Sequence, residues 1–281
     1  MTDYEHYQET AANYDRTRSA IGVEIVLGCL AREGRPLSEI SVLDAGCGTG
    51  NYSIALVDYV KRIEAVDISR GMLDVAAAKM NGYQEEGRIA FHEANLADLP
   101  FEDARFDAVM VNQVLHHLDT QRNGDCGDWP NHLCVLREFH RVLRPGGILV
   151  INTCSQKQLE RGYWYFQLIP EAAKNVARRY APLPMLRKML AATGFTCHET
   201  YVPLETACQG EAYFDPRGPL KKEWRDGDSS FALASEQELD RLQRSMVEMN
   251  AEGRLSQYFE EQDLPRKSVG QLAFVFASKG S

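Results

Sequence analysis

Residues 42–51 have the sequence VLDAGCGTGN, which predicts a buried strand ending in an acid, then a glycine-rich loop and the start of a helix. The apolar residues before the loop suit a strand of a parallel sheet. The three glycines allow a tight turn and let a ligand approach the main chain closely. The helix expected over residues 52–60 would direct its N-terminal N–H groups at whatever lies over the loop. We therefore expect a small-molecule site at the carboxyl end of this strand.

The sequence of the loop disfavours two common nucleotide sites. The dinucleotide fingerprint G-x-G-x-x-G/A needs a small residue where Asn51 stands, so the fit to NAD or FAD is poor. The phosphate loop G-x-x-x-x-G-K-[ST] does not occur in the chain, which disfavours a nucleotide triphosphatase.

Further strand-like segments follow in order. Residues 62–69, RIEAVDIS, predict a strand that ends at Asp67, where the ribose-binding acid of nucleoside-binding folds is expected; Ser69 suits the N-cap of the next helix. Residues 106–118, FDAVMVNQVLHHL, predict a central strand with polar residues at its carboxyl end. Residues 141–151, RVLRPGGILVI, predict a helix end, a tight turn and a fifth strand.

These segments, together with 89–101 (IAFHEANLADLPF), resemble the motifs of class I S-adenosylmethionine (SAM)-dependent methyltransferases of type 11. The motif D-x-G-x-G-x-G is intact, whereas Asn95 stands where the family usually has an acid. The resemblance implies an α/β Rossmann-like fold with a mostly parallel seven-stranded sheet, an antiparallel last strand and helical cap insertions. It also implies SAM as cofactor, S-adenosylhomocysteine (SAH) as product and methyl transfer by in-line displacement.

The same resemblance assigns the cofactor contacts. The loop would hold the amino-acid end of the cofactor, the acid after the second strand its ribose, and the third motif its adenine. The implied residues are Asp44, Gly46, Cys47, Gly48, Asp67, Ile68, Met72, Asn95, Leu96, Asn112 and Tyr14. An amide oxygen at Asn95 can still accept from the adenine amine.

Candidate catalytic residues follow the fourth strand. They are His117, His116 and Gln113. A general base is needed only when the acceptor keeps its proton at neutral pH, as an alcohol or phenol does. Packing or capping is the alternative role for either histidine.

The chain divides into three parts that we expect to form one structural domain: a helical lid over residues 1–35, a SAM-binding core over 36–153, and a completion of the sheet over 154–281 with cap insertions at 155–182 and 205–267. About 65 residues separate the last two predicted strands, far more than a hairpin loop needs. Aromatic residues of the lid, the cap and the loop 120–132 are candidates for the substrate pocket. They are Tyr7, Trp164, Tyr165 and Trp129, and burial in a local core is the alternative for each.

Composition favours a small-molecule enzyme. The 281 residues are 44% hydrophobic and 25% charged with a net charge of −9, so no basic surface for nucleic acid is expected. Seven cysteines without a C-x-x-C pair predict reduced thiols, no metal site and a cytoplasmic location. No apolar stretch is long enough for a membrane span. We expect a small-molecule acceptor, no nucleic-acid or membrane partner, and a monomer or homodimer; the alternatives are an RNA or protein methyltransferase and a non-catalytic SAM-binding protein.

Overall fold

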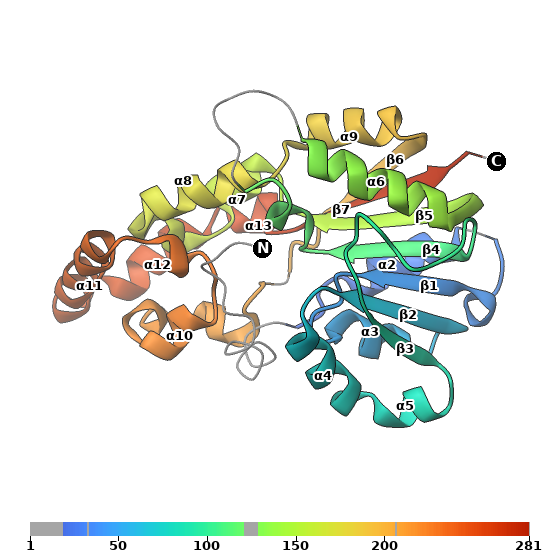
Figure 1. The fold of residues 1–281 in the computed structure, drawn as a ribbon. Helices are drawn as coiled ribbons and strands as arrows, with labels where there is room; N and C mark the ends of the chain where they lie inside the picture. Colours follow the sequence, from blue (N-terminus) through green and yellow to red (C-terminus); the bar gives the residue numbers. More distant parts are fainter. Residues whose placement is uncertain (1–18, 33, 121–128, 206, 281) are drawn as a thin grey trace.

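Seven strands form one mixed sheet in the order β3-β2-β1-β4-β5-β7-β6 (Figure 1). The structure is a computed structural model that describes residues 19–280 apart from 33, 121–128 and 206. All neighbouring strands are parallel except β7, which runs antiparallel to both β5 and β6. The strands are β1 (Ser41–Ala45), β2 (Arg62–Asp67), β3 (Ile89–Glu93), β4 (Phe106–Asn112), β5 (Leu143–Thr153), β6 (Phe195–Tyr201) and β7 (Ala273–Lys279). This arrangement confirms the expected Rossmann-like class I fold.

Helices cover both faces of the sheet, and alternate strand residues serve the two faces. Val42 of β1 belongs to the core beneath α2 (Val23–Ala31) and α3 (Asn51–Leu56), with α4 (Arg70–Lys79) beside them. Its neighbour Leu43 belongs to the opposite core, beneath α6 (Pro130–Val142) and α9 (Leu183–Ala192). Both residues are fully buried, as in a sheet that is covered on both sides. Shorter elements complete this part: η1 (Leu37–Glu39), α5 (Asn81–Glu85) and η2 (Leu115–His117).

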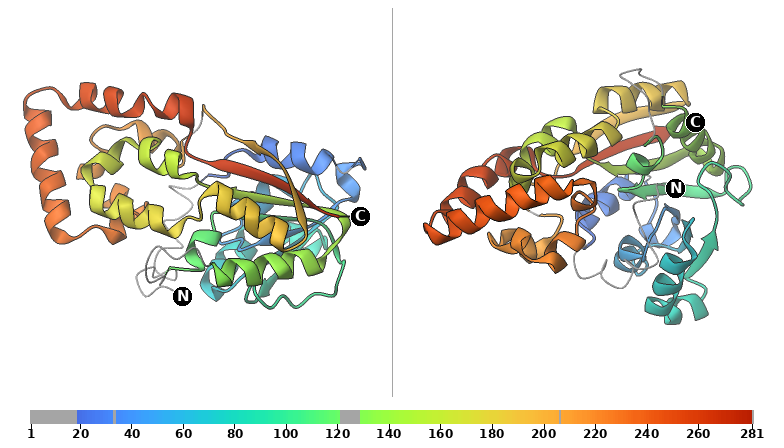
Figure 2. Two further views of the ribbon diagram at one scale, coloured as in Figure 1. Left: turned by 90° about the horizontal axis from the view of Figure 1, so that it is seen from above. Right: turned by 60° about the vertical axis from the view of Figure 1, so that its left-hand side comes forward.

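A helical cap lies beyond the carboxyl ends of the parallel strands (Figures 1 and 2). It is built from the segment after β5 and from the long insertion between β6 and β7. Its elements are α7 (Gln156–Arg161), η3 (Trp164–Leu168), α8 (Pro170–Arg179), η4 (Gly210–Phe214), η5 (Gly218–Leu220), α10 (Lys222–Asp226), η6 (Phe231–Leu233), α11 (Glu236–Ala251), α12 (Leu255–Asp263) and α13 (Arg266–Val269). The longest of these, α11, begins after the N-cap Ser235, whose side chain accepts from the Glu238 N–H. No helix among the described residues is both long and apolar enough to cross a bilayer.

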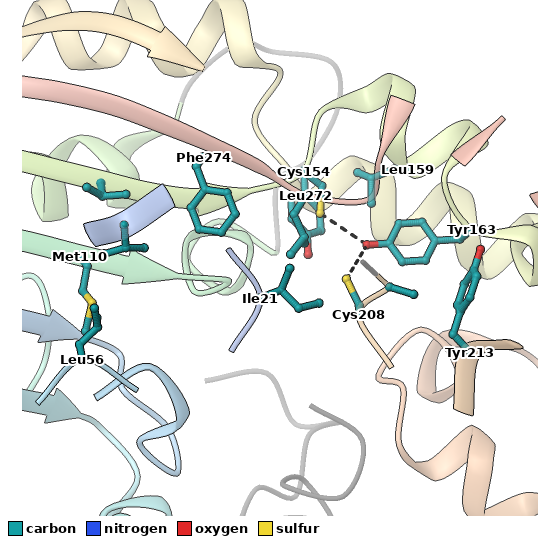
Figure 3. Packing of buried hydrophobic residues seen from close by; sticks show 14 of the residues in the cluster. Ile21, Leu56, Met110, Cys154, Leu159, Tyr163, Cys208, Tyr213, Leu272 and Phe274 are labelled. Atoms are coloured by element: carbon teal, nitrogen blue, oxygen red, sulfur yellow. Dashed lines mark hydrogen bonds between the residues drawn. The ribbon is translucent and has the colours of Figure 1, made fainter. Parts of the chain in front are cut away.

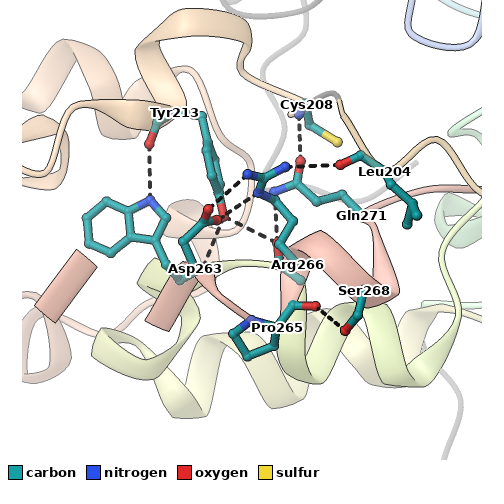
Figure 4. A network of polar contacts seen from close by, with 10 residues as sticks. Leu204, Cys208, Tyr213, Asp263, Pro265, Arg266, Ser268 and Gln271 are labelled. Atoms are coloured by element: carbon teal, nitrogen blue, oxygen red, sulfur yellow. Dashed lines mark hydrogen bonds and ion pairs between the residues drawn. The ribbon is translucent and has the colours of Figure 1, made fainter. Parts of the chain in front are cut away.

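Buried polar contacts join the two cap insertions (Figure 4). Arg266 forms a two-pronged ion pair with Asp263, at 2.7 and 2.8 Å, and Tyr213 donates to the same carboxylate at 2.7 Å. Gln271 accepts from the Cys208 backbone N–H at 2.6 Å and donates to the Gly162 carbonyl at 2.9 Å. The chain leading into β7 is therefore attached to both insertions, which fixes the cap relative to the sheet.

Candidate functional site

The glycine loop after β1 has the conformation that its composition predicts. Gly46, Gly48 and Gly50 all have positive φ, at 77°, 54° and 78°. A Cβ at Gly46 would lie 2.5 Å from Cγ2 of Val114, so a side chain is excluded there. A Cβ at Gly48 would meet nothing within 4 Å, which leaves the main chain open toward a cavity.

Asp44 lies beneath this loop and is 1% exposed. Its Oδ2 accepts from the Ser53 hydroxyl of α3 at 2.7 Å. Burial raises the pKa of Asp44 to about 7; the Ser53 hydrogen bond opposes this rise and the negative charge of Asp67 adds to it. A cationic group nearby would favour the ionised carboxylate, so Asp44 suits the neighbourhood of a bound amine.

Asp67 at the end of β2 faces the same loop. One carboxylate oxygen accepts from the Gly48 backbone N–H and the other from the Ser69 N–H, both at 2.9 Å. Burial raises its pKa, although these backbone hydrogen bonds favour the charged form. Ser69 also caps α4, as expected, by accepting from the Met72 N–H at 3.4 Å. The carboxylate is thus held at the edge of the cavity, in the place where a ribose is expected.

The residues expected at the adenine line one wall of this cavity. Ile68 is 53% exposed on that wall, whereas Met72 and Leu96 are buried. Asn95 also lines the cavity, and its Oδ1 accepts from the Ala97 N–H at 3.0 Å. A carbonyl oxygen has two lone pairs, so Asn95 keeps acceptor capacity toward an amine.

Asn112 ends β4 inside the cavity, and both polar atoms of its side chain are buried with no hydrogen-bond partner. Buried amides are nearly always hydrogen-bonded, so an orphaned one calls for a ligand. Cys47 lines the same cavity, and burial raises the pKa of its thiol well above the usual range.

One cavity of about 910 Å³ joins the cofactor side to the cap. Its size is within the range of small-molecule sites. Lining residues on the cofactor side include Asp44, Gly46, Gly48, Asp67 and Asn112. The cap contributes apolar side chains, which are Leu159, Tyr163, Phe166, Val176, Phe231, Leu233, Leu239 and Leu272. It also contributes charged and hydroxyl-bearing ones, which are Arg179, Lys222, Arg225, Asp226, Asp228, Ser229 and Ser230.

The predicted catalytic residues all line this cavity, between its two sides. His116 and His117 belong to η2, with ring centroids 3.9 Å apart, and His116 stacks on Tyr180 at 4.4 Å. Gln113 has a positive φ of 54°, which is uncommon for a residue with a side chain. Its amide donates to Asn152 Oδ1 and accepts from the Tyr180 hydroxyl, both at 2.9 Å.

Two cysteines and a tyrosine meet near the same place (Figure 3). The Tyr163 hydroxyl lies 3.8 Å from Cys154 Sγ and 3.5 Å from Cys208 Sγ. Burial raises the pKa of Cys154 to about 12 and that of Tyr163 well above its usual range. These groups are therefore neutral at physiological pH.

The structure corrects the expected aromatic lining. Trp164 and Tyr165 are fully buried and do not reach the cavity. Trp164 donates to the Tyr213 carbonyl at 3.1 Å, and the Tyr165 hydroxyl donates to Asp228 in a short hydrogen bond. Tyr163 and Phe166 line the cavity instead. In a 3₁₀-helix, residues three apart share a face, so this pair faces the cavity while Trp164 and Tyr165 face the cap interior.

Trp129 does not line the cavity either. It is 3% exposed and packs edge-on against His132, with centroids 4.8 Å apart, at the start of α6. Tyr7 and Tyr14 lie outside the described residues. Sequence reasoning missed the cavity residues Tyr52, Asn152 and Tyr180 as well as Tyr163 and Phe166. Of Tyr52, Asn152 and Tyr180, only Asn152 could have been found from the sequence, because it lies at the end of the fifth strand.

Comparison with known proteins agrees with this site. Residues 43–151 match the family model described as "Methyltransferase domain". The demethylmenaquinone methyltransferase of Clavibacter sepedonicus is 30% identical over 194 residues, covering 66% of this chain and 74% of the relative. That of Lysinibacillus sphaericus is 28% identical over 197 residues, covering 66% and 78%.

Solved structures share the fold. A protein of Anabaena variabilis, named as a candidate methyltransferase from an antibiotic biosynthesis pathway, is 20% identical with a TM-score of 0.72, covering 94% of this chain and 98% of that one. The geranyl diphosphate C-methyltransferase of Streptomyces coelicolor, solved with SAH, is 13% identical with a TM-score of 0.52, covering 92% and 74%. These findings define the class as SAM-dependent methyltransferases with the class I fold. Within that class, the chain belongs to the type 11 methyltransferase domain family and is an enzyme that uses SAM.

The residues present fit this cofactor. The open main chain at Gly48 and the orphaned amide of Asn112 leave room and hydrogen-bonding capacity beside the two acids. The described residues bring no group of three metal-ligating side chains together.

Proposed function

We propose that the protein methylates a small, apolar, ring-containing acceptor that binds between the sheet and the cap. The observation that carries this proposal is that one cavity joins the residues assigned to the cofactor with apolar side chains of the cap. Small-molecule sites are typically apolar with a few placed polar groups. The curated relatives are named as demethylmenaquinone methyltransferases, and this supports a small-molecule acceptor.

In this proposal the core residues orient the cofactor. Asp67 accepts hydrogen bonds from the ribose hydroxyls, which replace its present hydrogen bond from the Gly48 N–H. Ile68, Met72, Asn95 and Leu96 enclose the adenine, and Asp44 and the loop hold the amino-acid end. The bound cofactor supplies an electrophilic methyl group on a sulfonium. Holding two reactants in line can contribute on the order of 7–11 kcal/mol, so orientation is the main task of these residues.

Proton removal falls to a histidine when the acceptor carries a hydroxyl. His117 and His116 line the cavity just after β4, and this supports an imidazole as the base. Gln113 takes no proton in this proposal, because its amide is neutral and engaged at both ends. It positions its neighbours.

The cellular setting follows from the cysteines. The six described cysteines are all free thiols, which supports a reducing compartment such as the cytoplasm. A macromolecular acceptor would need a basic or open groove. The three basic residues of the cap wall, Arg179, Lys222 and Arg225, are accompanied by Asp226 and Asp228, so the wall is of mixed charge rather than basic.

Calorimetry with SAH tests the cofactor site directly. Wild type should bind SAH, and Asp67→Ala should weaken binding by about 1–3 kcal/mol, the cost of losing a charged hydrogen bond. Asp74→Ala, an exposed acid of α4, is the matched control and should leave the affinity unchanged. An acceptor screen with methyl-labelled SAM follows. Absence of SAH binding by wild type, or equal binding by Asp67→Ala, would refute the assignment.

A further inference from the structure

A chain of hydrogen bonds crosses the floor of the cavity and links five separate segments of the chain. The Tyr52 hydroxyl of α3 contacts the Ile21 carbonyl oxygen at 2.7 Å, and Asn152 Nδ2 contacts the Tyr52 hydroxyl at 2.8 Å. Gln113 Nε2 lies 2.9 Å from Asn152 Oδ1, and the Tyr180 hydroxyl lies 2.9 Å from Gln113 Oε1. The chain thus runs from the segment before α2, across the ends of β5 and β4, to the cap.

We call this chain of hydrogen bonds the relay. The direction of each of its hydrogen bonds is fixed by its first member, the Ile21 carbonyl. A backbone carbonyl can only accept, so Tyr52 must donate its proton to Ile21 and must accept from Asn152. Asn152 therefore presents its NH₂ to Tyr52 and its oxygen to Gln113. Gln113 in turn presents its NH₂ to Asn152 and its oxygen to Tyr180, so Tyr180 must donate.

Tyr180 then has no proton left for a ligand. It is 8% exposed and lines the cavity beside the ends of β4 and β5. Its hydroxyl also lies within hydrogen-bonding reach of the Cys154 thiol. A phenol oxygen has two lone pairs, so it can accept from a ligand but cannot donate to one. A methyl acceptor that binds at this oxygen must therefore be the donor of the hydrogen bond.

We propose that Tyr180, polarised by the relay, selects methyl acceptors that carry a hydrogen-bond donor, which is a hydroxyl or an N–H. It rejects methyl acceptors that present to it only an oxygen without a proton. This inference rests on the proposed function, because it specifies the acceptor of that same site.

Gln113 is the positioning residue in this arrangement. Its backbone N–H donates to the Asn152 carbonyl at 2.9 Å, so main chain and side chain are both attached to Asn152. These contacts stabilise the positive φ of 54°, a strained conformation of the kind that persists at functional sites when its surroundings hold it. The orientation of the amide is therefore determined by the fold before any ligand binds.

Binding of a matched pair of probes tests the proposal. We would titrate the SAH-loaded enzyme with 1-naphthol and with 1-methoxynaphthalene, which differ in whether the oxygen carries a proton. Wild type should favour 1-naphthol by at least about tenfold, the ratio produced by an unmet buried hydrogen-bonding group worth about 1.4 kcal/mol. Tyr180→Phe should abolish this preference without changing SAH affinity.

Gln113→Met tests the polarity itself. It removes the amide and frees the Tyr180 hydroxyl to rotate and donate, so affinity for 1-methoxynaphthalene should rise relative to 1-naphthol. Tyr59→Phe, at an exposed tyrosine outside the cavity, is the matched control and should retain the wild-type ratio. If Gln113→Met does not fold, Tyr180→Phe still decides the question.

The outcomes separate the two proposals. Normal SAH binding with equal affinities for the two probes, or with no binding of 1-naphthol, would overturn the selection by Tyr180 alone. Failure of wild type to bind SAH would overturn the proposed function and the inference that rests on it.

Discussion

Replacing Asp44 by Asn should make the free energy of unfolding less dependent on pH. The carboxyl group is 1% exposed, and burial raises its pKa from 3.8 to about 7. A raised pKa means that the folded state binds the proton more tightly than the unfolded state does. The stability that this group contributes is therefore fully present below about pH 4 and is lost as the pH rises through 7. Asn keeps an oxygen for the Ser53 hydroxyl but has no proton to lose.

The magnitude follows from the two pKa values. Between about pH 4 and pH 7, the wild-type free energy of unfolding should fall by about 1.4 kcal/mol per pH unit from this residue, to a total of about 4 kcal/mol. The group is fully buried, so solvent does not reduce this effect, and relaxation of the site makes the total a ceiling. At pH 8 the ligand-free variant should be more stable than wild type by up to this amount.

Urea unfolding of the ligand-free proteins at half-unit steps from pH 5 to pH 8.5 measures this difference. Asp74→Asn, at an exposed acid of α4, controls for the general loss of one negative charge. SAH should narrow the gap near pH 7, because its cationic amine favours the ionised Asp44 of wild type. Parallel stability curves for wild type and Asp44→Asn would refute the reasoning, since they would mean that Asp44 titrates alike in the folded and unfolded states.

Three other substitutions test the site and its frame. Gly46→Ala should weaken SAH binding at least about tenfold in calorimetry, because φ is 77° and the added methyl group meets a valine side chain; unchanged affinity would contradict the loop geometry. Arg266→Met should lower the free energy of urea unfolding by about 3–5 kcal/mol, because it leaves Asp263 charged and buried; a loss under 1 kcal/mol would contradict this. Tyr165→Phe should cost about 1–3 kcal/mol through its lost hydrogen bond to Asp228 but leave SAH affinity unchanged, and weakened SAH binding would place this ring in the site after all.

The cofactor side of the site could be predicted from sequence because its parts are local. The loop, Asp44 and Asp67 lie at strand ends, and the carboxyl ends of parallel strands meet at one edge of a sheet. Their spacing along the chain thus translates directly into proximity. The family motif carries the same information, and the fold confirms the expected sheet.

The acceptor side could not be predicted in the same way. Its walls come from segments far apart in the chain, and no periodic pattern connects Tyr163 with Phe231. The aromatic run beginning at Tyr163 shows why composition alone misleads. Four adjacent rings cannot all face one cavity, and the 3₁₀ geometry, which turns Tyr163 and Phe166 inward, was not readable from the residues.

The relay gives the acceptor side its chemical character. At the floor of the cavity, Asn112 and the relay residues Gln113, Asn152 and Tyr180 contribute amides and a phenol, and the imidazoles of His116 and His117 line the cavity near them. Neutral amides and a phenol give a positive charge little stabilisation. The methyl transfer proposed here removes the positive charge of the cofactor's sulfonium, so it does not need such stabilisation. The same neutrality makes hydrogen-bond direction, rather than charge, the property by which this floor can distinguish acceptors, and a single backbone carbonyl at Ile21 sets that direction for the whole relay.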